Sequence, residues 1–80
     1  MATDFAGQPK VVGVKQVRRA LSSSGVSRLF LARNADPQML QPLAEAAEEQ
    51  GVETEYMDTM KELGQRFGIA VGAAVAALLK

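Results

Sequence analysis

Eighty residues with 48% hydrophobic and 22% charged side chains suffice for one small globular domain, and they exclude a disordered chain or several separate cores. The chain has no His and no Cys, so it lacks the usual general base, imidazole and thiolate metal ligands and disulfides. Composition therefore argues against an enzyme and indicates no metal site and no cofactor.

The net charge is zero, with nine basic and nine acidic residues, but the two halves differ. Residues 1–40 carry six basic and two acidic side chains, a balance of +4, whereas residues 41–80 carry three and seven, a balance of −4. No acidic residue lies between Lys10 and Arg33. Such a division is a hint of binding to nucleic acid or another anionic surface, if the fold keeps the basic half on one face.

The start of the chain has neither a basic cluster nor an apolar stretch, so it is not typical of a signal peptide, and we expect a cytoplasmic protein. Residues 1–9 are expected to form a flexible tail before a single domain over residues 10–80. The most apolar stretch, Ile69–Leu79, has 11 residues. A membrane-spanning helix needs roughly 18, so we predict no membrane partner.

The first predicted elements are a short strand and a basic helix. Lys10–Val12 is expected to form the strand, Gly13 marks a bend, and Ser22–Gly25 ends the helix that follows. Apolar residues at steps of three and four predict its buried face: Val14, Val17, Ala20 and Leu21. The opposite face carries three cations: Lys15, Arg18 and Arg19. On this segment alone, an ordinary solvated helix surface is the simpler interpretation.

A buried strand and a longer helix come next. Val26–Ala32 includes an apolar run without alternation, which is typical of a strand buried on both faces, as in parallel sheets. Asp36 can cap the free amides of a helix, and Pro37 suits its first position. Gly51 suits the left-handed residue at the end of that helix. Its predicted buried stripe consists of Leu40, Leu43, Ala44 and Ala47.

The last third of the chain predicts a strand, a helix and one ambiguous segment. Within Val52–Met57, the residues Val52, Thr54 and Tyr56 alternate with Glu53 and Glu55, which indicates a half-exposed strand. Thr59–Glu62 matches a capping box and predicts a helix over Met60–Phe67, with Gly68 as its stop. The alanines of Ala73–Leu79 favour a helix, but so short an apolar run also suits a buried strand. Because strands and helices alternate before it, we predict a strand.

These elements follow one another in the order β-α-β-α-β-α-β. Such alternation predicts an α/β fold. The architecture we expect is a three-layer α-β-α sandwich, in which a small mixed sheet of about four strands lies between helices.

Few segments of the sequence suggest a catalytic, metal or ligand-binding site. Neighbouring acids such as Glu48 and Glu49 point in different directions and are better explained as solvated surface than as an acid–base pair or metal site. The sequence contains no Walker or dinucleotide-binding pattern. Gly13–Gln16 is more informative, because the free amides at a helix start attract phosphate and glycine permits close backbone approach.

Four side chains of this helix suit nucleic acid. Lys15 can donate hydrogen bonds to guanine O6 and N7, and Gln16 can pair with base edges. Arg18 and Arg19 would then hold the phosphate backbone.

Three groups of residues also follow one another with a characteristic spacing: Val12–Leu21, Leu31–Pro37, and Met60–Gly64 with Phe67–Ala74. Together they resemble the kink-turn-binding ribosomal-protein family L7Ae, and most closely its short bacterial members. The resemblance runs from about Val11 to Lys80. It implies a three-layer α-β-α fold and binding to kink-turn RNA, an internal-loop motif whose tandem sheared G·A pairs bend a duplex sharply.

The resemblance also implies two groups of RNA-contacting residues. In that family the start of the first helix enters the widened major groove at the G·A pairs, and the loop after the last helix packs on an extruded nucleotide. The first group is Gly13, Lys15, Gln16 and Arg19, with Arg18 as a phosphate contact beside them. The second, apolar group is Ile69, Ala70, Val71, Gly72 and Ala73. Charge beside apolar surface suits RNA, whose splayed bases need stacking.

The chain departs from the family pattern at a few positions. Lys15 and Gln16 stand where many archaeal and eukaryotic members carry Asn-Glu, a difference shared with the bacterial branch. Asn34 stands where an acidic residue is common, and Ala70 replaces a frequent Glu. The usual partners of these last two side chains are therefore not carried over.

The predicted function is a non-enzymatic, monomeric RNA-binding protein that recognises and stabilises kink-turn RNA, in a ribosome or another ribonucleoprotein. The alternative is a protein-interaction module on the same scaffold. In that case the acidic helix around Glu45–Glu49 and an exposed loop over Ile69–Ala73 would dock a basic protein or a larger ribonucleoprotein.

Overall fold

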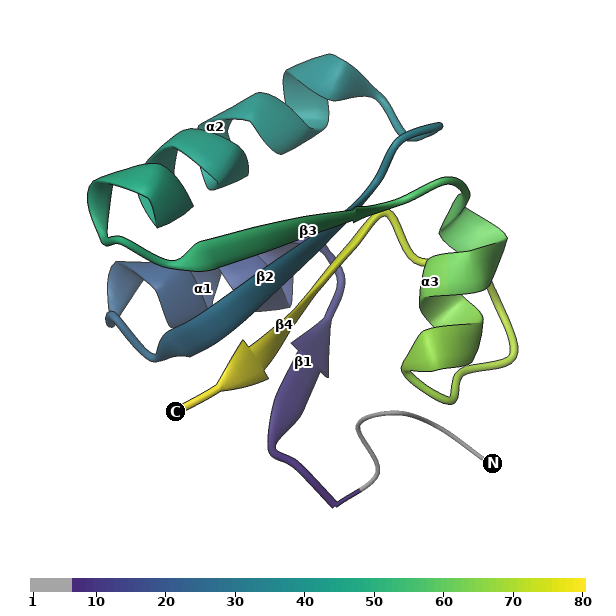
Figure 1. Cartoon of the computed structure of the whole chain (residues 1–80), viewed down its shortest axis with the longest axis horizontal. Coiled ribbons are helices and arrows are strands. Elements are labelled where there is room, and N and C mark those ends of the chain that lie inside the picture. Colours follow the sequence, from purple (N-terminus) through teal and green to yellow (C-terminus); the bar gives the residue numbers. More distant parts are fainter. Residues whose placement is uncertain (1–6) are drawn as a thin grey trace.

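The computed structural model describes residues 7–80, and seven elements alternate along this part of the chain (Figure 1). They are β1 (Lys10–Val12), α1 (Val14–Ser22), β2 (Val26–Ala32), α2 (Pro37–Glu49), β3 (Glu53–Met57), α3 (Met60–Arg66) and β4 (Val75–Leu79). The predicted order is confirmed. The ambiguous segment Ala73–Leu79 forms a strand that begins at Val75, two residues later than predicted.

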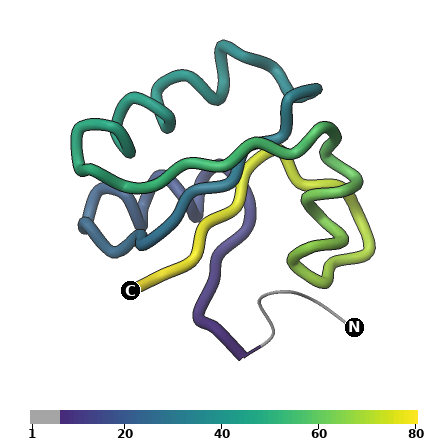
Figure 2. The backbone as a smooth tube through the Cα atoms, in the orientation of Figure 1, coloured from purple at the N-terminus to yellow at the C-terminus, as the bar shows by residue number. Residues whose placement is uncertain are grey.

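The four strands form one mixed sheet in the order β1-β4-β2-β3. Strand β4 is antiparallel to β1 and to β2, whereas β2 and β3 are parallel. Figure 2 shows β4 (yellow) running between β1 (purple) and β2. As a result, β1, β2 and β3 all finish where β4 begins. We call this end of the sheet its carboxyl end.

Helices cover both faces of the sheet, which confirms the predicted three-layer sandwich. α1 and α2 lie on one face, where the side-chain amide of Gln50 donates to the carbonyl of Leu21 at 2.7 Å (Figure 1). α3 packs on the other face. There the Phe30 ring of β2 meets Phe67 edge-on, with centroids 5.3 Å apart and planes inclined by 72°. Because side chains alternate along a strand, the neighbouring Leu31 faces α2 instead.

Buried apolar side chains fill both interfaces, and the predicted helix stripes are confirmed in part, because Val14, Ala20 and Ala44 are only partly buried against the core. Val17 and Leu21 of α1 are buried, as are Leu40, Leu43 and Ala47 of α2. The apolar run of β2 is buried on both faces, as its lack of alternation predicts. No polar or charged side chain of residues 7–80 is buried.

Side chains cap α2 and α3 at the predicted positions. The carboxylate of Asp36 accepts a hydrogen bond from the amide of Gln38 at 2.9 Å, and the hydroxyl of Thr59 accepts one from the amide of Glu62 at 3.1 Å. The Glu62 carboxylate in turn accepts from the amide of Asp58 at 3.3 Å. An ordinary capping box would bond the amide of Thr59, so the return bond here lies one residue earlier.

The predicted tail falls mostly on residues 1–6, which lie outside the described residues. The carbonyl of Pro9 accepts a hydrogen bond from the amide of Leu79 at 2.9 Å. Pairing with the sheet therefore begins at least one residue before the predicted domain start. Between residues 7 and 80, no helix is both long and apolar enough to cross a membrane.

Replacing Thr59 with Ala tests the cap of α3. We expect Thr59→Ala to lower the free energy of unfolding by about 1 kcal/mol, because one amide of the first turn loses its partner. Thr59→Ser keeps the hydroxyl and should stay close to the original stability. Urea denaturation of the three chains measures the difference, and equal midpoints for all three would show that the cap does not stabilise the fold.

Candidate nucleic-acid interface

The carboxyl end of the sheet places the start of α1 beside the segment that follows the predicted apolar loop. The amide of Gly13, just before α1, donates to the carbonyl of Val75 at 2.9 Å. The amide of Ala32, at the end of β2, donates to the carbonyl of Ala74 at 3.0 Å. The loop that leads into β4 is thereby fixed between the start of α1 and the end of β2.

The start of α1 carries no side-chain cap, unlike the starts of α2 and α3. The cap position just before Val14 is occupied by Gly13, whose φ of 104° strains any residue with a side chain. A side chain would meet no atom within 4 Å, so this position is open. The first turn contains no acidic residue. The structure therefore leaves the partial positive charge of this helix end available to an anion.

The predicted basic face of α1 is exposed. Lys15, Gln16, Arg18 and Arg19 all lie at the surface, and the three cations form no ion pair with any residue from 7 to 80. Gln16 and Arg19 line one groove, of about 420 Å³, along β1 and the end of β4. Arg18 lines a different groove, toward α2. Of the two arginines, Arg19 thus lies on the same side of α1 as Gln16.

The apolar loop is exposed over fewer residues than predicted. Val71 is 72% exposed, and Ala70 and Gly72 also lie at the surface. Ile69 packs partly against the core, and Ala73 is only 4% exposed, with its amide donating to the carbonyl of Met60 at 2.9 Å. The expectation of an exposed loop over Ile69–Ala73 is wrong for Ala73, since its small apolar side chain fills the space beneath the loop.

Two glycines let this loop lie directly on α3. A Cβ atom at Gly64 would stand 2.2 Å from the carbonyl oxygen of Val71, and one at Gly72 would stand 3.2 Å from backbone and side-chain atoms of Met60. Backbone therefore packs on backbone, and the exposed part of the loop has little freedom to shift. Gly64 belongs to one of the segments that carry the family resemblance, but sequence spacing alone does not reveal this contact.

Asn34, one of the departures from the family pattern, has a structural partner. Its side-chain oxygen accepts a hydrogen bond from the amide of Met60 at 2.8 Å. This bond joins the turn after β2 to the first residue of α3. A carboxylate could accept the same bond, so the substitution keeps the contact while removing a negative charge from the carboxyl end.

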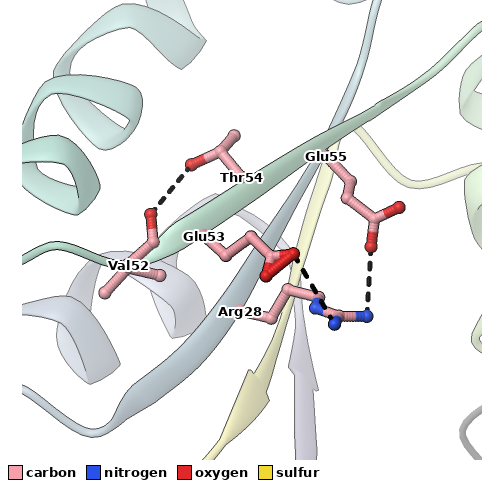
Figure 3. Close-up of polar contacts among 5 residues, drawn as sticks. All are labelled: Arg28, Val52, Glu53, Thr54 and Glu55. Atoms are coloured by element: carbon pink, nitrogen blue, oxygen red, sulfur yellow. Dashed lines mark hydrogen bonds and ion pairs between the residues drawn. The ribbon is translucent and has the colours of Figure 1, made fainter.

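Two cations of the basic half are neutralised by the acidic half. Figure 3 shows Arg28 reaching across to β3, where it pairs with Glu55 (Nη1 to Oε2, 3.1 Å) and with Glu53 (Nη2 to Oε1, 3.7 Å). Arg33 pairs with Asp58 at 3.7 Å. The acid-free run in the sequence is therefore not one continuous basic surface, and its unpaired positive charge is concentrated on α1.

The acidic side chains provide no metal site in the part of the chain that the structure describes. No group of three or more potential ligands occurs there. Glu48 and Glu49 are exposed on α2, as expected for solvated surface.

Comparison with known proteins identifies one matching family and several similar proteins. The model of the ribosomal protein L7Ae/L30e/S12e/Gadd45 family matches residues 6–80. RNA-binding protein TTE2299 of Caldanaerobacter subterraneus subsp. tengcongensis is 44% identical over 68 residues, which cover 85% of this chain and 83% of that protein. Large ribosomal subunit protein eL8 of Halobacterium salinarum is 31% identical over 68 residues, covering 84% of this chain and 57% of that protein.

Solved structures share the fold. The Giardia lamblia 15.5kD RNA binding protein superposes with a TM-score of 0.82 at 22% sequence identity. The superposition covers 90% of this chain but 61% of that one, so this chain spans less than two thirds of its length.

Because α3 and the loop are in close contact, we expect one methyl group added at Gly64 to lower stability. Gly64→Ala should lower the free energy of unfolding by about 1–3 kcal/mol, because the loop backbone must move away from α3. Gly25→Ala is the matched control, since its Cβ would lie 3.5 Å from the nearest atom, an ordinary contact. We expect that control to change stability by less than about 0.5 kcal/mol. Urea denaturation of both variants tests this, and a Gly64→Ala chain as stable as the control would contradict it.

Proposed function

Because the chain belongs to the ribosomal protein L7Ae/L30e/S12e/Gadd45 family, we propose that it is a non-enzymatic RNA-binding protein that recognises and stabilises kink-turn RNA. The relatives described above are named as RNA-binding or ribosomal proteins and not as enzymes. One observation supports the proposal most: the uncapped, basic start of α1 lies beside the apolar loop at the carboxyl end of the sheet.

The start of α1 suits the widened groove of a kinked duplex. Its free amides and helix dipole attract a phosphate, and the glycine at the cap position lets the RNA approach the backbone. Lys15 then donates to the O6 and N7 acceptors of a guanine, while the Gln16 amide can both donate and accept at a base edge. Arg18 and Arg19 add phosphate contacts from the next turn, and these contribute affinity without reading sequence.

The loop suits a nucleotide that has left the helical stack. Val71 presents an apolar side chain, and the glycines on either side of the α3 contact hold the loop in one shape. A loop that is already ordered loses less conformational entropy when RNA binds. Ala70 and Gly72 contribute surface beside Val71, whereas Ile69 and Ala73 support the loop from below.

Stabilisation of the kink follows from the difference in affinity between two RNA shapes. A straight internal loop presents neither the widened groove nor the extruded nucleotide, so the start of α1 and the loop contact only the kinked form together. Binding therefore shifts the RNA toward that form, by no more than this difference in affinity allows. We place this activity in the cytoplasm, on a ribosome or another ribonucleoprotein, with a monomer as the binding unit.

Substitutions at Lys15 and Gln16 test base recognition. Lys15→Ala and Gln16→Ala should each weaken binding to a kink-turn RNA by about tenfold, because a bidentate base contact is lost. Binding to the same RNA with its tandem G·A pairs replaced by Watson–Crick pairs should change far less. Lys10→Ala removes an equal charge from the opposite face of the sheet and serves as the control. Electrophoretic mobility shifts measure each of the three variants on both RNAs, and equal losses on both RNAs would remove base recognition from the proposal.

Salt dependence tests the role of the arginines. Arg19→Gln should weaken binding to kinked and Watson–Crick RNA to a similar extent, and it should reduce the slope of log affinity against log salt by about one. Titrations at two or more salt concentrations give that slope. If the slope stays the same while Glu45→Lys or Glu48→Lys alters association with a ribonucleoprotein, the protein-interaction alternative is the better account.

A further inference from the structure

A second exposed feature at the carboxyl end combines an aromatic ring with a guanidinium. Tyr56, near the end of β3, is 50% exposed, and the carbon at the centre of the Arg33 guanidinium lies 5.3 Å from the centre of its ring. An arginine over a tyrosine holds both side chains in a defined arrangement. Neither residue belongs to the two groups of RNA contacts described above.

Both side chains line an apolar groove of about 420 Å³ between α2 and the ends of β2 and β3. The groove walls include Ala35, Pro37 and Leu40. Planar, apolar surfaces with one cation nearby are what single-stranded nucleic acid needs, since every base has a ring face to stack and every nucleotide has a phosphate. The chemistry of the groove therefore fits an unpaired nucleotide.

The groove lies at the same end of the sheet as the proposed RNA surface. The amide of Arg33 donates to the carbonyl of Met57 at 2.8 Å, and the amide of the preceding Ala32 donates to Ala74 at 3.0 Å, next to the apolar loop. The turn that carries Arg33 is thus attached to the segment that follows the loop. An RNA seated on α1 and the loop has the groove beside it at the same end of the sheet.

The ion pair of Arg33 does not prevent a phosphate contact. The pair joins Nε of Arg33 to Oδ1 of Asp58 at 3.7 Å, and the two side chains are 64% and 87% exposed. Exposed ion pairs of this length contribute little, because water screens them. A phosphate can therefore replace Asp58 at low cost.

We propose that Tyr56 and Arg33 form an additional RNA subsite, which stacks an unpaired base next to the kinked segment and contacts its phosphate. This inference rests on the proposed function, because it takes its RNA from the surface of α1 and the loop. Stacking tolerates any base, so the subsite adds affinity for RNA with an unpaired extension and does not select its sequence.

Binding of extended RNAs tests the subsite. The kink-turn RNA is prepared without an extension and with a short unpaired extension at each end in turn. We expect one extension to raise affinity at least about fivefold, as stacking of one base on an aromatic ring does. Tyr56 is the only tyrosine and there is no Trp, so the NMR signals of its labelled ring identify the contact without ambiguity. They should shift with the extended RNA and not with the RNA that lacks an extension.

Variants at the subsite separate stacking from simple apolar contact. Tyr56→Leu should remove the advantage of the extended RNA while leaving affinity for the RNA without an extension unchanged. Tyr56→Phe keeps the ring and should keep the advantage. Arg33→Gln should reduce the affinity advantage of the extended RNA at low salt. Because both residues are exposed, urea denaturation is expected to show folded variants of similar stability.

The outcomes distinguish this inference from the proposed function. If kink-turn RNA binds specifically but no extension raises affinity or shifts the Tyr56 signals, the inference is overturned and the groove is better suited to a protein. If the kink-turn RNA binds no better than its Watson–Crick control, the proposed function fails instead. A single-stranded RNA pentamer is then added alone, and a shift of the Tyr56 ring signals supports the subsite, whereas unchanged signals overturn it.

Discussion

The pairing of β4 with two strands at once is the constraint on which the rest of the structure depends. Strands β1 and β2 do not pair with each other, and β4 joins them into one sheet. The same strand leads the apolar loop to the start of α1, where Val75 accepts the hydrogen bond from Gly13. Its alanines Ala76 and Ala77 are fully buried, one on each face, so helices can approach the sheet closely on both sides.

Electrostatics explains how a chain without net charge can present a surface suited to an anion. Arg28 and Arg33 are paired with carboxylates, whereas the cations of α1 pair with no residue in the described part of the chain. The helix whose cations stay unpaired is also the one whose start lacks a side-chain cap. Unpaired side-chain charge and the positive end of a helix thus coincide in one place, while acidic residues outnumber basic ones over the rest of the chain.

Local patterns predicted the elements of this fold well, because helix caps, apolar steps and turn residues act within a few positions. Asp36, Thr59 and Gly51 lie at the helix ends where the sequence predicts them. The order of the strands and the partners of Arg28 depend on contacts between distant residues, which no local pattern records. The burial of Ala73 and the contact between Arg33 and Tyr56 could not be predicted from local patterns either, since each depends on how separate turns pack at the carboxyl end of the sheet.

The strand order also affects how the protein avoids aggregation. The two apolar strands, β2 and β4, lie in the middle of the sheet, and among residues 7–80 its outer strands are β1 and β3. Strand β3 carries Glu53 and Glu55, and charged side chains on an edge discourage pairing with another chain. Strand β1 protects β4 with only three residues, Lys10–Val12. If that short strand separates, the backbone N–H and C=O groups of the apolar strand β4 become an open edge, so resistance to amyloid-like association depends on the smallest element of the fold.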